Sequence, residues 1–490
     1  MIAEQTAEQW KQRDVRFEPT MSAEEALMWR VETDPWLAPS GGMVIITDTP
    51  VDIEMFRRRI AYAITQLPRL RERVIEPSSP LARPEWQTDR DFDLDYHLRH
   101  VALPAPGERR QLFDLAIRLL DDPYDRSRPL WMFTVVDGLA DGRGAVFGKL
   151  HHAVSDGTGA IRLAEMFMEL EPDAPPPPDV DLDEVIRADL DAAATRDGDA
   201  VGALVAAAVK APLGLARAVA GEVALSLADP QHAVEAGTGA VESLAGAIGE
   251  LTGGDGGEGS PLFGQRSRRR QLEGLRVPLE DAKAAAKALG GTINDLFVTA
   301  VAEGTARYHA RHEAANSALN LSFVVSTRHD DEAGGNAFTP TMVRMPPGRH
   351  TLRGRFEILR GRMADKRAAM EEGGNPLATV AGLAAALPTS AITRVARDSA
   401  RRVDIATSNF RAAPFTVYIS GARIVENYTL GPVMGTAGNI TLMSYDGSLD
   451  IGMVFDPAAV AHPGELRDDI AAAFDDLLAE APASDPPTGP

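Results

Sequence analysis

The chain has 490 residues, of which 44% are hydrophobic and 25% are charged, and it contains no cysteine. This length predicts two domains, and the lack of cysteine excludes disulfides, cysteine metal ligands and a thiol nucleophile. The formal net charge of −21 argues against a general nucleic-acid-binding protein, because affinity for phosphate depends on an excess of Lys and Arg.

The N-terminal residues and the apolar segments bear on localisation. Residues 1–10 mix charged and polar side chains where a signal peptide needs a basic start and an apolar stretch. Residues 200–227 are the most apolar long region, but charged residues and a proline interrupt them, so they do not form a membrane span. We therefore expect a cytoplasmic protein, with peripheral attachment to the inner face of the plasma membrane or to lipid droplets left open.

Two basic runs stand out on this acidic chain. One comprises Arg266, Arg268, Arg269 and Arg270, and the other extends through residues 349–367. A solvated helix face is the simpler interpretation of each run. The sharper hypothesis is a site for a phosphorylated small molecule or for an anionic lipid surface.

Residues 20–170 mix strand and helix patterns. Apolar runs predict strands at residues 42–47, 131–136 and 145–150, and the apolar spacing predicts a helix at 51–66. The period becomes helical again from residue 161 to residue 170. Four prolines at residues 175–178 cannot continue a helix or a central strand, so they mark a boundary and define a first domain of residues 1–178.

Residues 179–275 are rich in alanine and glycine and predict a helical crossover linker. Its helical pieces are expected at residues 201–211 and 213–227, and a glycine-rich stretch follows at 253–260. The linker either packs on both domains or forms a lid or membrane-facing flap.

Residues 276–482 predict a second mixed domain, followed by a disordered, proline-rich tail at residues 483–490. The expected helices are residues 281–289, 294–310 and 466–478, and the expected strands are residues 318–325, 339–345, 415–419 and 449–455. The sequence therefore predicts an α/β fold of two domains joined by a long crossover.

The strongest chemical signal is the run Gly-Lys-Leu-His-His-Ala-Val-Ser-Asp-Gly-Thr-Gly at residues 148–159. It places His151 and His152 at a strand end, where a side chain can be held rigidly and still reach a cavity. A histidine can take a proton from a hydroxyl or amine at neutral pH and return it to a leaving group. Asp156, four residues after His152, either pairs with it or holds the loop.

Three other interpretations of this run compete with general-base catalysis. A metal site lacks a His-Glu-x-x-His pattern and an evident third ligand, so we expect no metal. A Ser-His-Asp hydrolase lacks a Gly-x-Ser-x-Gly elbow. A purely structural role is expected for His151 and competes evenly with a catalytic role for His152 on the residues alone.

The run from His151 to Gly157 matches the His-His-x-x-x-Asp-Gly signature of the coenzyme A dependent acyltransferase superfamily, which peptide-synthetase condensation domains share. Other landmarks resemble the bacterial wax ester synthase/diacylglycerol acyltransferase family. These landmarks are Phe-Asp-Leu-Asp-Tyr-His at residues 92–97, Arg-Ser-Arg-Pro-Leu-Trp at 126–131, Asn294-Asp295, Asp-Glu-Ala-Gly-Gly-Asn at 331–336, Thr-Ser-Asn at 407–409, Gly-Ala-Arg at 421–423 and Asn-Ile-Thr-Leu-Met-Ser-Tyr at 439–445. They follow the family's order over about residues 20–480.

The resemblance implies two domains similar to chloramphenicol acetyltransferase, with mixed sheets and an active-site tunnel between them. It implies transfer of a long-chain acyl group from acyl-CoA, a co-substrate rather than a resident cofactor, to diacylglycerol or a fatty alcohol. His152 would be the general base, with His151 and Asp295 in supporting roles and Asp156 holding the loop. Asn294 would either donate to the oxyanion or cap the helix that starts there.

Departures from the family pattern concern the acceptor. The family usually has Pro-Gly-Pro after its Ser-Asn pair, whereas Phe410 and three further residues other than glycine or proline follow Asn409 here. This change bears on which acceptor alcohol is used. The sequence does not determine the acyl chain length, the oligomeric state or the membrane affinity. The alternatives are a condensation-type acyltransferase that uses a carrier-protein thioester, and a lipid-surface protein without activity.

Overall fold

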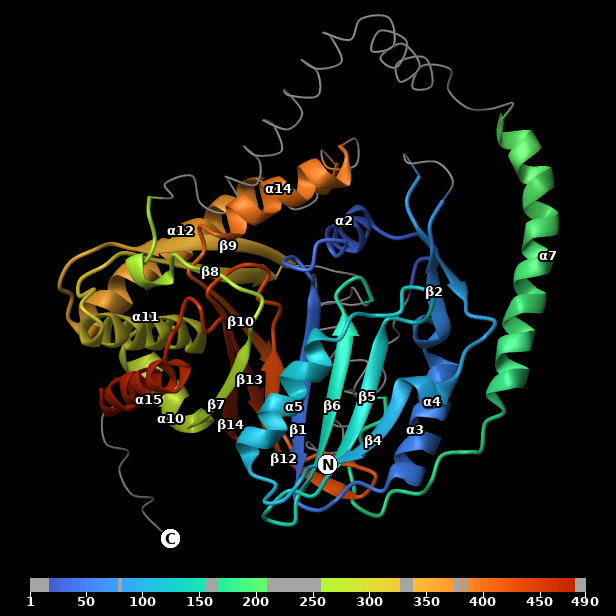
Figure 1. Ribbon diagram of the computed structural model, residues 1–490, viewed down its shortest axis with the longest axis horizontal. Coiled ribbons are helices and arrows are strands. Elements are labelled where there is room, and N and C mark those ends of the chain that lie inside the picture. Colours follow the sequence, from blue (N-terminus) through green and yellow to red (C-terminus); the bar gives the residue numbers. More distant parts are fainter. Residues whose placement is uncertain are drawn as a thin grey trace, which may run out of the picture.

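The computed structural model describes residues 17–77, 82–154, 166–208, 257–326, 338–373, 380–382, 384 and 387–480. Two six-stranded sheets organise these residues (Figure 1). The first has the strand order β11-β12-β1-β6-β5-β4 and the second has the order β7-β14-β13-β10-β8-β9. This arrangement agrees with the predicted mixed α/β fold.

The first sheet combines strands from both halves of the chain. Its strands are β1 (Ser40–Thr47), β4 (Leu98–Ala102), β5 (Trp131–Asp137), β6 (Gly144–His151), β11 (Tyr418–Ile419) and β12 (Ala422–Leu430). β1 pairs with β6 on one side and with β12 on the other, in both cases antiparallel. The segment 418–430 thus crosses from the second half of the sequence to complete the first sheet.

The second sheet is built from the second half of the chain. Its strands are β7 (Gln271–Pro278), β8 (Leu319–Ser326), β9 (Phe338–Met345), β10 (Ile405–Arg411), β13 (Gly438–Tyr445) and β14 (Ser448–Phe455). β10 runs parallel to β13 and β8, and the other pairs are antiparallel. A short hairpin-like pair, β2 (Glu72–Ile75) and β3 (Glu85–Thr88), stands apart from both sheets.

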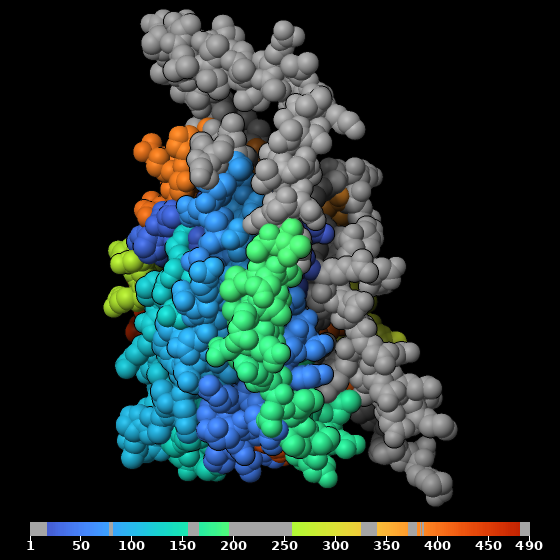
Figure 2. Space-filling model, turned by 90° about the vertical axis from the view of Figure 1, so that its right-hand side faces the viewer, coloured from blue at the N-terminus to red at the C-terminus, as the bar shows by residue number. Residues whose placement is uncertain are grey.

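Helices cover the two sheets. They are α2 (Ala23–Val31), α3 (Ile53–Gln66), α4 (Leu94–His97), α5 (Arg109–Asp121), α7 (Leu182–Ala208), α10 (Leu279–Ala288), α11 (Ile293–Arg311), α12 (Leu352–Gly373), α14 (Thr389–Ala400) and α15 (Pro463–Ala479), with short 3₁₀ turns at Pro68–Arg71 and Pro261–Phe263. In the second half, α10, α11, α12 and α15 bury their apolar residues against the second sheet. α7 lies along the outside of the first half, where Asp189 pairs with the buried Arg71 at 2.6 Å (Figures 1 and 2).

A shared apolar layer joins the halves. Val44 and Phe147 of the first sheet pack in one cluster with Leu272 and Val454 of the second sheet, and α5 contributes Leu112 among others. Burial of large aliphatic and aromatic side chains stabilises such a layer by about 2 kcal/mol for each side chain. The two sheets are therefore held together by a continuous core rather than by a few surface contacts.

Most predicted elements match the structure, with differences at three places. The strands predicted at 42–47, 131–136 and 145–150 are β1, β5 and β6, and the strand predicted at 415–419 is reduced to the two residues of β11. The helix predicted over 161–170 is wrong for its described part, because Glu169 bridges to Tyr418 as extended chain. The predicted linker helix begins at Leu182 rather than at residue 201. Residues 209–256, which include the second predicted linker helix, lie outside the described parts of the chain.

A buried histidine in α11 makes stability depend on pH. His309 Nε2 lies 2.8 Å from the hydroxyl oxygen of Ser260, which also accepts the N–H of Leu262. Burial, with smaller contributions from Arg355 and His312, lowers the pKa of His309 to about 4. The folded state therefore keeps this ring neutral at pH values where the unfolded chain protonates it.

We expect this histidine to stabilise the protein above about pH 6.5 and to lose that contribution as the pH falls toward 4, by about 3 kcal/mol in total. The His309→Gln variant cannot titrate at this position. The difference in unfolding free energy between wild type and variant, from urea unfolding at pH 7, 5.5 and 4, should therefore shrink as the pH falls. A difference that stays constant with pH would contradict this assignment.

Candidate active site

The end of β6 carries the two histidines. His151 is the last residue of β6 and pairs with Ser40 of β1 in the sheet. The chain then turns, because the N–H of His152 donates to the carbonyl of Pro39 at 3.1 Å and the N–H of Val154 donates to the carbonyl of His151 at 2.9 Å. A central strand and two backbone hydrogen bonds therefore fix the position from which the His152 side chain leaves the sheet.

The His151 side chain lies inside the protein, with 0% of its surface exposed. Its Nδ1 accepts the N–H of Ala153 at 2.9 Å, and its Nε2 lies 3.3 Å from a carboxylate oxygen of Glu32. Because the Nδ1 lone pair is occupied by an amide proton, the ring proton resides on Nε2 and faces the carboxylate. The His151 ring is therefore held in one orientation and is closed to solvent.

Glu32 is a residue that the sequence did not single out. It follows the last residue of α2 and is held by Arg126, whose Nη1 lies 3.6 Å from its carboxylate and whose guanidinium lies 3.4 Å above the Trp29 ring. Burial raises the pKa of Glu32, but contacts with His151, Arg126 and Lys149 outweigh it and bring the pKa below its ordinary value. A carboxylate thus stands behind His151 at neutral pH. Nothing in the local sequence around Glu32 marks this pairing across 119 positions.

His152 lies at the junction of β1 and the crossing strand β12. Its side chain is partly exposed. A side-chain carbon placed on Gly41 would lie 3.6 Å from His152 Nε2 and 3.6 Å from the carbonyl oxygen of Leu430. The absence of a side chain at Gly41 therefore leaves space beside this ring nitrogen, next to a strand from the second half of the chain. Asp156 lies outside the described residues.

Asn294 and Asp295 begin α11 in the second half. Thr292 is the N-cap, because its hydroxyl accepts the N–H of Asp295 at 3.2 Å, while the carboxylate of Asp295 accepts the N–H and hydroxyl of Thr292, each at 2.8 Å. This reciprocal capping satisfies donors that a helix N-terminus leaves free. Asp295 is thus committed to the helix end, and the cap that we considered for Asn294 belongs to Thr292.

The Asn294 side chain instead pairs with a residue of β10. Asn409 Nδ2 donates to Asn294 Oδ1 at 2.6 Å, and Asn294 Nδ2 lies 3.9 Å from the sulfur of Met363. Two landmarks of the sequence that are 115 positions apart therefore touch. Since its oxygen is used by Asn409 and its only other described contact is a weak acceptor, Asn294 keeps N–H donor capacity for a further partner.

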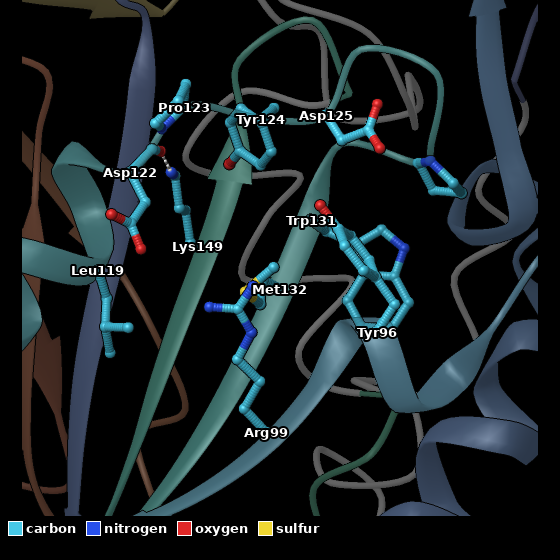
Figure 3. A pocket seen from close by; sticks show the side chains of 11 residues that line it. Tyr96, Arg99, Leu119, Asp122, Pro123, Tyr124, Asp125, Trp131, Met132 and Lys149 are labelled. Atoms are coloured by element: carbon cyan, nitrogen blue, oxygen red, sulfur yellow. Dashed lines mark hydrogen bonds between the residues drawn. The ribbon is translucent and has the colours of Figure 1, made fainter.

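A small pocket lies on the first half (Figure 3), and one of its lining residues, Tyr124, has its ring 5.8 Å from the His151 ring. It has a cavity volume of about 30 Å³ and is lined by Tyr96, Arg99, Leu119, Asp122, Pro123, Tyr124, Asp125, Pro129, Trp131, Met132 and Lys149. Lys149 Nζ donates to the carbonyl of Asp122 at the end of α5 and lies 4.3 Å from the Tyr124 ring. Burial lowers the pKa of Lys149 to about 8 despite the nearby carboxylates. A long acyl chain needs a long apolar channel, whereas this pocket is small and lined by charged side chains, so it does not suit such a chain.

In the parts of the chain that the structure describes, there is no group of three or more His, Asp or Glu side chains placed to hold a metal ion. Among the described helices, none combines the length and the apolar character required to cross a bilayer.

The chain is similar to known proteins over nearly its whole length. Residues 21–297 match the profile of the wax ester synthase/diacylglycerol acyltransferase catalytic domain, and residues 334–478 match the C-terminal domain of the same family. A Mycobacterium tuberculosis protein assigned as a diacylglycerol O-acyltransferase is 32% identical over 471 residues, which cover 95% of this chain and 93% of that protein.

Solved structures show the same fold at lower sequence identity. The wax ester synthase/diacylglycerol acyltransferase from Marinobacter aquaeolei superposes with a TM-score of 0.61 at 18% identity, covering 94% of this chain and 99% of that one. The first condensation domain of the calcium-dependent antibiotic synthetase superposes with a TM-score of 0.56 at 16% identity, covering 96% and 98%. These two likenesses concern the fold alone.

Proposed function

Because the chain belongs to the wax ester synthase/diacylglycerol acyltransferase family, we propose that it moves a long-chain fatty acyl group from acyl-CoA to diacylglycerol, to a fatty alcohol, or to both. The observation that carries the proposal is the geometry at the end of β6. Its buried histidine is locked in place, and its second histidine presents a ring nitrogen beside Gly41 and the crossing strand. This is the arrangement that a positioned general base requires.

His152 is proposed to remove the proton from the acceptor hydroxyl. The hydroxyl oxygen attacks the thioester carbonyl, and the carbon–sulfur bond breaks as the tetrahedral intermediate collapses. The proton held by His152 then passes to the sulfur of the departing coenzyme A. This route needs no acyl-enzyme, and much of its acceleration comes from holding the two substrates in line.

The developing oxyanion requires hydrogen-bond donors, each worth about 3 to 4 kcal/mol in other enzymes. Asn294 is our candidate donor, because its amide oxygen is occupied by Asn409 while its N–H groups retain capacity. His151 and Asp295 are assigned supporting roles, and Asp156 is expected to hold the loop after His152. We propose that the two substrates meet in a tunnel between the two halves of the fold.

The acceptor is a lipid, so we propose that the protein works at the surface of a membrane or a lipid droplet. Two observations support this: long-chain lipid alcohols partition into membranes, and the chain has exposed basic segments around Arg268 and Arg353. Recovery of the protein with floated phosphatidylglycerol vesicles is expected. Failure to float, with full activity on dispersed substrate, would remove this part of the proposal.

The reaction is tested by incubating the purified protein with palmitoyl-CoA and either dioleoylglycerol or hexadecanol, and by separating the lipid products. Triacylglycerol, wax ester or both should form, with one coenzyme A thiol released for each ester. Products that form only from a carrier-protein thioester would favour the condensation-type alternative. Lipid binding without either ester would favour a protein that keeps the fold without activity.

A further inference from the structure

Five arginines gather at one end of the second sheet, and we propose that they hold the phosphate groups of the acyl-CoA donor. This strand-end basic cluster consists of Arg266, Arg268, Arg269, Arg401 and Arg402. The inference rests on the proposed function, because it assigns a binding place to the donor of that reaction.

One part of the cluster comes from the segment before β7, which crosses the end of the sheet. Arg266 donates from Nε to the carbonyl of Gly435 at 3.1 Å and from Nη2 to the carbonyl of Val403, just before β10, at 3.4 Å. Ser267 then bonds to Asp456, directly after β14. Arg268 and Arg269 follow on the way to β7, which starts at Gln271. Positions 266–270 therefore pass over the ends of four neighbouring strands.

The other part of the cluster comes from the end of α14. Arg401 and Arg402 stand between α14 and β10, so they flank the same Val403 carbonyl that Arg266 contacts. The strand ends beneath are in register, since Gln271 pairs with Phe455, Phe455 with Gly438, and Gly438 with Ile405. Three strand spacings make this end about 14 Å wide, which is room for more than one phosphate group.

Within the cluster, Arg266 lies near the buried carboxylates of Asp404 and Asp456, which offset its charge. Arg268, Arg269, Arg401 and Arg402 are exposed, and within the described parts of the chain none of them forms an ion pair. The carboxylates of Asp404 and Asp456 are buried and accept backbone N–H groups. Asp404 accepts the N–H groups of Ser260 and Asn320, and Asp456 accepts those of Ser267 and Ala458.

The second basic run of the sequence is partly neutralised by ion pairs. On α12, Arg353 pairs with Glu357 at 3.5 Å, Arg355 with Glu303 at 2.9 Å and Arg367 with Asp295 at 3.6 Å. These three arginines form ion pairs, whereas Arg349, Arg360 and Arg362 of the same run form none among the described residues. The strand-end basic cluster differs in that its arginines come from two separate segments that meet at one end of a sheet, and planar guanidinium groups suit phosphate oxygens.

A short loop connects the cluster to the catalytic histidine. It begins at Leu430, whose carbonyl lies beside Gly41 and His152, and it reaches Gly435, whose carbonyl accepts from Arg266. Five residues span at most about 18 Å, which limits the separation. Within the loop, the carbonyl of Pro432 accepts a hydrogen bond from Asn439 Nδ2 at 3.1 Å, which holds the loop against the start of β13. If the cluster binds the phosphate groups of acyl-CoA, the pantetheine arm can extend from them along this loop and place the thioester near His152.

Charge removal at the cluster tests the proposal. We expect the double variants Arg268→Gln/Arg269→Gln and Arg401→Gln/Arg402→Gln each to raise KM for palmitoyl-CoA about tenfold, a loss of about 1.4 kcal/mol, with kcat nearly unchanged. KM for palmitoyl-N-acetylcysteamine, a thioester without phosphates, should stay at the wild-type value. Added salt should raise KM for palmitoyl-CoA more in the wild type than in the variants.

The matched control is Arg349→Gln/Arg353→Gln, which removes the same charge from exposed positions of the other basic run. An equal KM increase in this control, or an equal increase with the truncated donor, would overturn the proposal. So would variants that lose binding to phosphatidylglycerol vesicles while KM for palmitoyl-CoA stays unchanged, because the cluster would then serve a lipid surface. If the wild type forms no ester at all, the proposed function fails, and calorimetric binding of coenzyme A to wild type and variants still decides the role of the cluster.

Discussion

The His152→Ala variant is expected to lose acyl transfer by about 10²- to 10⁴-fold, the usual contribution of a positioned general base. The loss should appear in kcat for both dioleoylglycerol and hexadecanol, because the proton is removed from a hydroxyl in each case. The protein should remain folded. The ring of His152 is only partly buried, and alanine keeps the hydrogen bond from the backbone N–H of residue 152 to the carbonyl of Pro39.

A surface histidine supplies the control for this variant. His100 on β4 is exposed and pairs with Asp137 at 2.7 Å, so His100→Ala removes an imidazole from the same sheet without touching the proposed site. Turnover is measured as coenzyme A thiol release, and folding as the midpoint of thermal unfolding. Wild-type turnover by His152→Ala would show that another group takes the proton. A loss of turnover that accompanied unfolding would leave the role of base to be tested with His152→Gln, which keeps a polar side chain of similar length.

The sequence was sufficient for the elements whose apolar pattern is local. β1, β5 and β6 are continuous apolar runs, and α3 has one apolar face, so burial alone determines their type. The same reasoning failed at residues 166–170, where the helical spacing of apolar residues is real but the backbone pairs with Tyr418. The partner strand is about 250 positions away, and no local pattern encodes it.

Long-range pairing also explains what the sequence missed in the site. The motif and the family resemblance identified the histidines. The contact between Glu32 and His151 could not be predicted, because it depends on α2 lying over the end of β6. The contact between Asn294 and Asn409 joins two known landmarks that had no evident connection. The basic run before β7 was recognised from composition, but its position across four strand ends depends on the order of strands in the sheet.

Glu32 is the residue for which the structure adds most, and its removal should lower kcat by about 10- to 100-fold. In Glu32→Ala the Nε2 proton of the fully buried His151 faces no acceptor, and a buried donor without a partner costs about 1 to 3 kcal/mol. The ring is then free to reorient and to release the N–H of Ala153, which flanks His152 in the turn. A displacement of a reacting group by about 1 Å is enough to reduce the rate about 100-fold.

Two companion variants separate positioning from general destabilisation. Glu32→Gln keeps an oxygen that can accept from His151 and should retain most of the wild-type kcat, while KM for palmitoyl-CoA stays unchanged in both Glu32 variants. Glu303 is a comparably buried glutamate paired with Arg307 and Arg355 in the second half. Glu303→Ala should lower the unfolding midpoint to a similar degree as Glu32→Ala and leave kcat intact. If Glu303→Ala reduced kcat as much as Glu32→Ala, or if Glu32→Gln were as slow as Glu32→Ala, the positioning role of the carboxylate would be wrong, because lost stability or lost charge would then explain the rate.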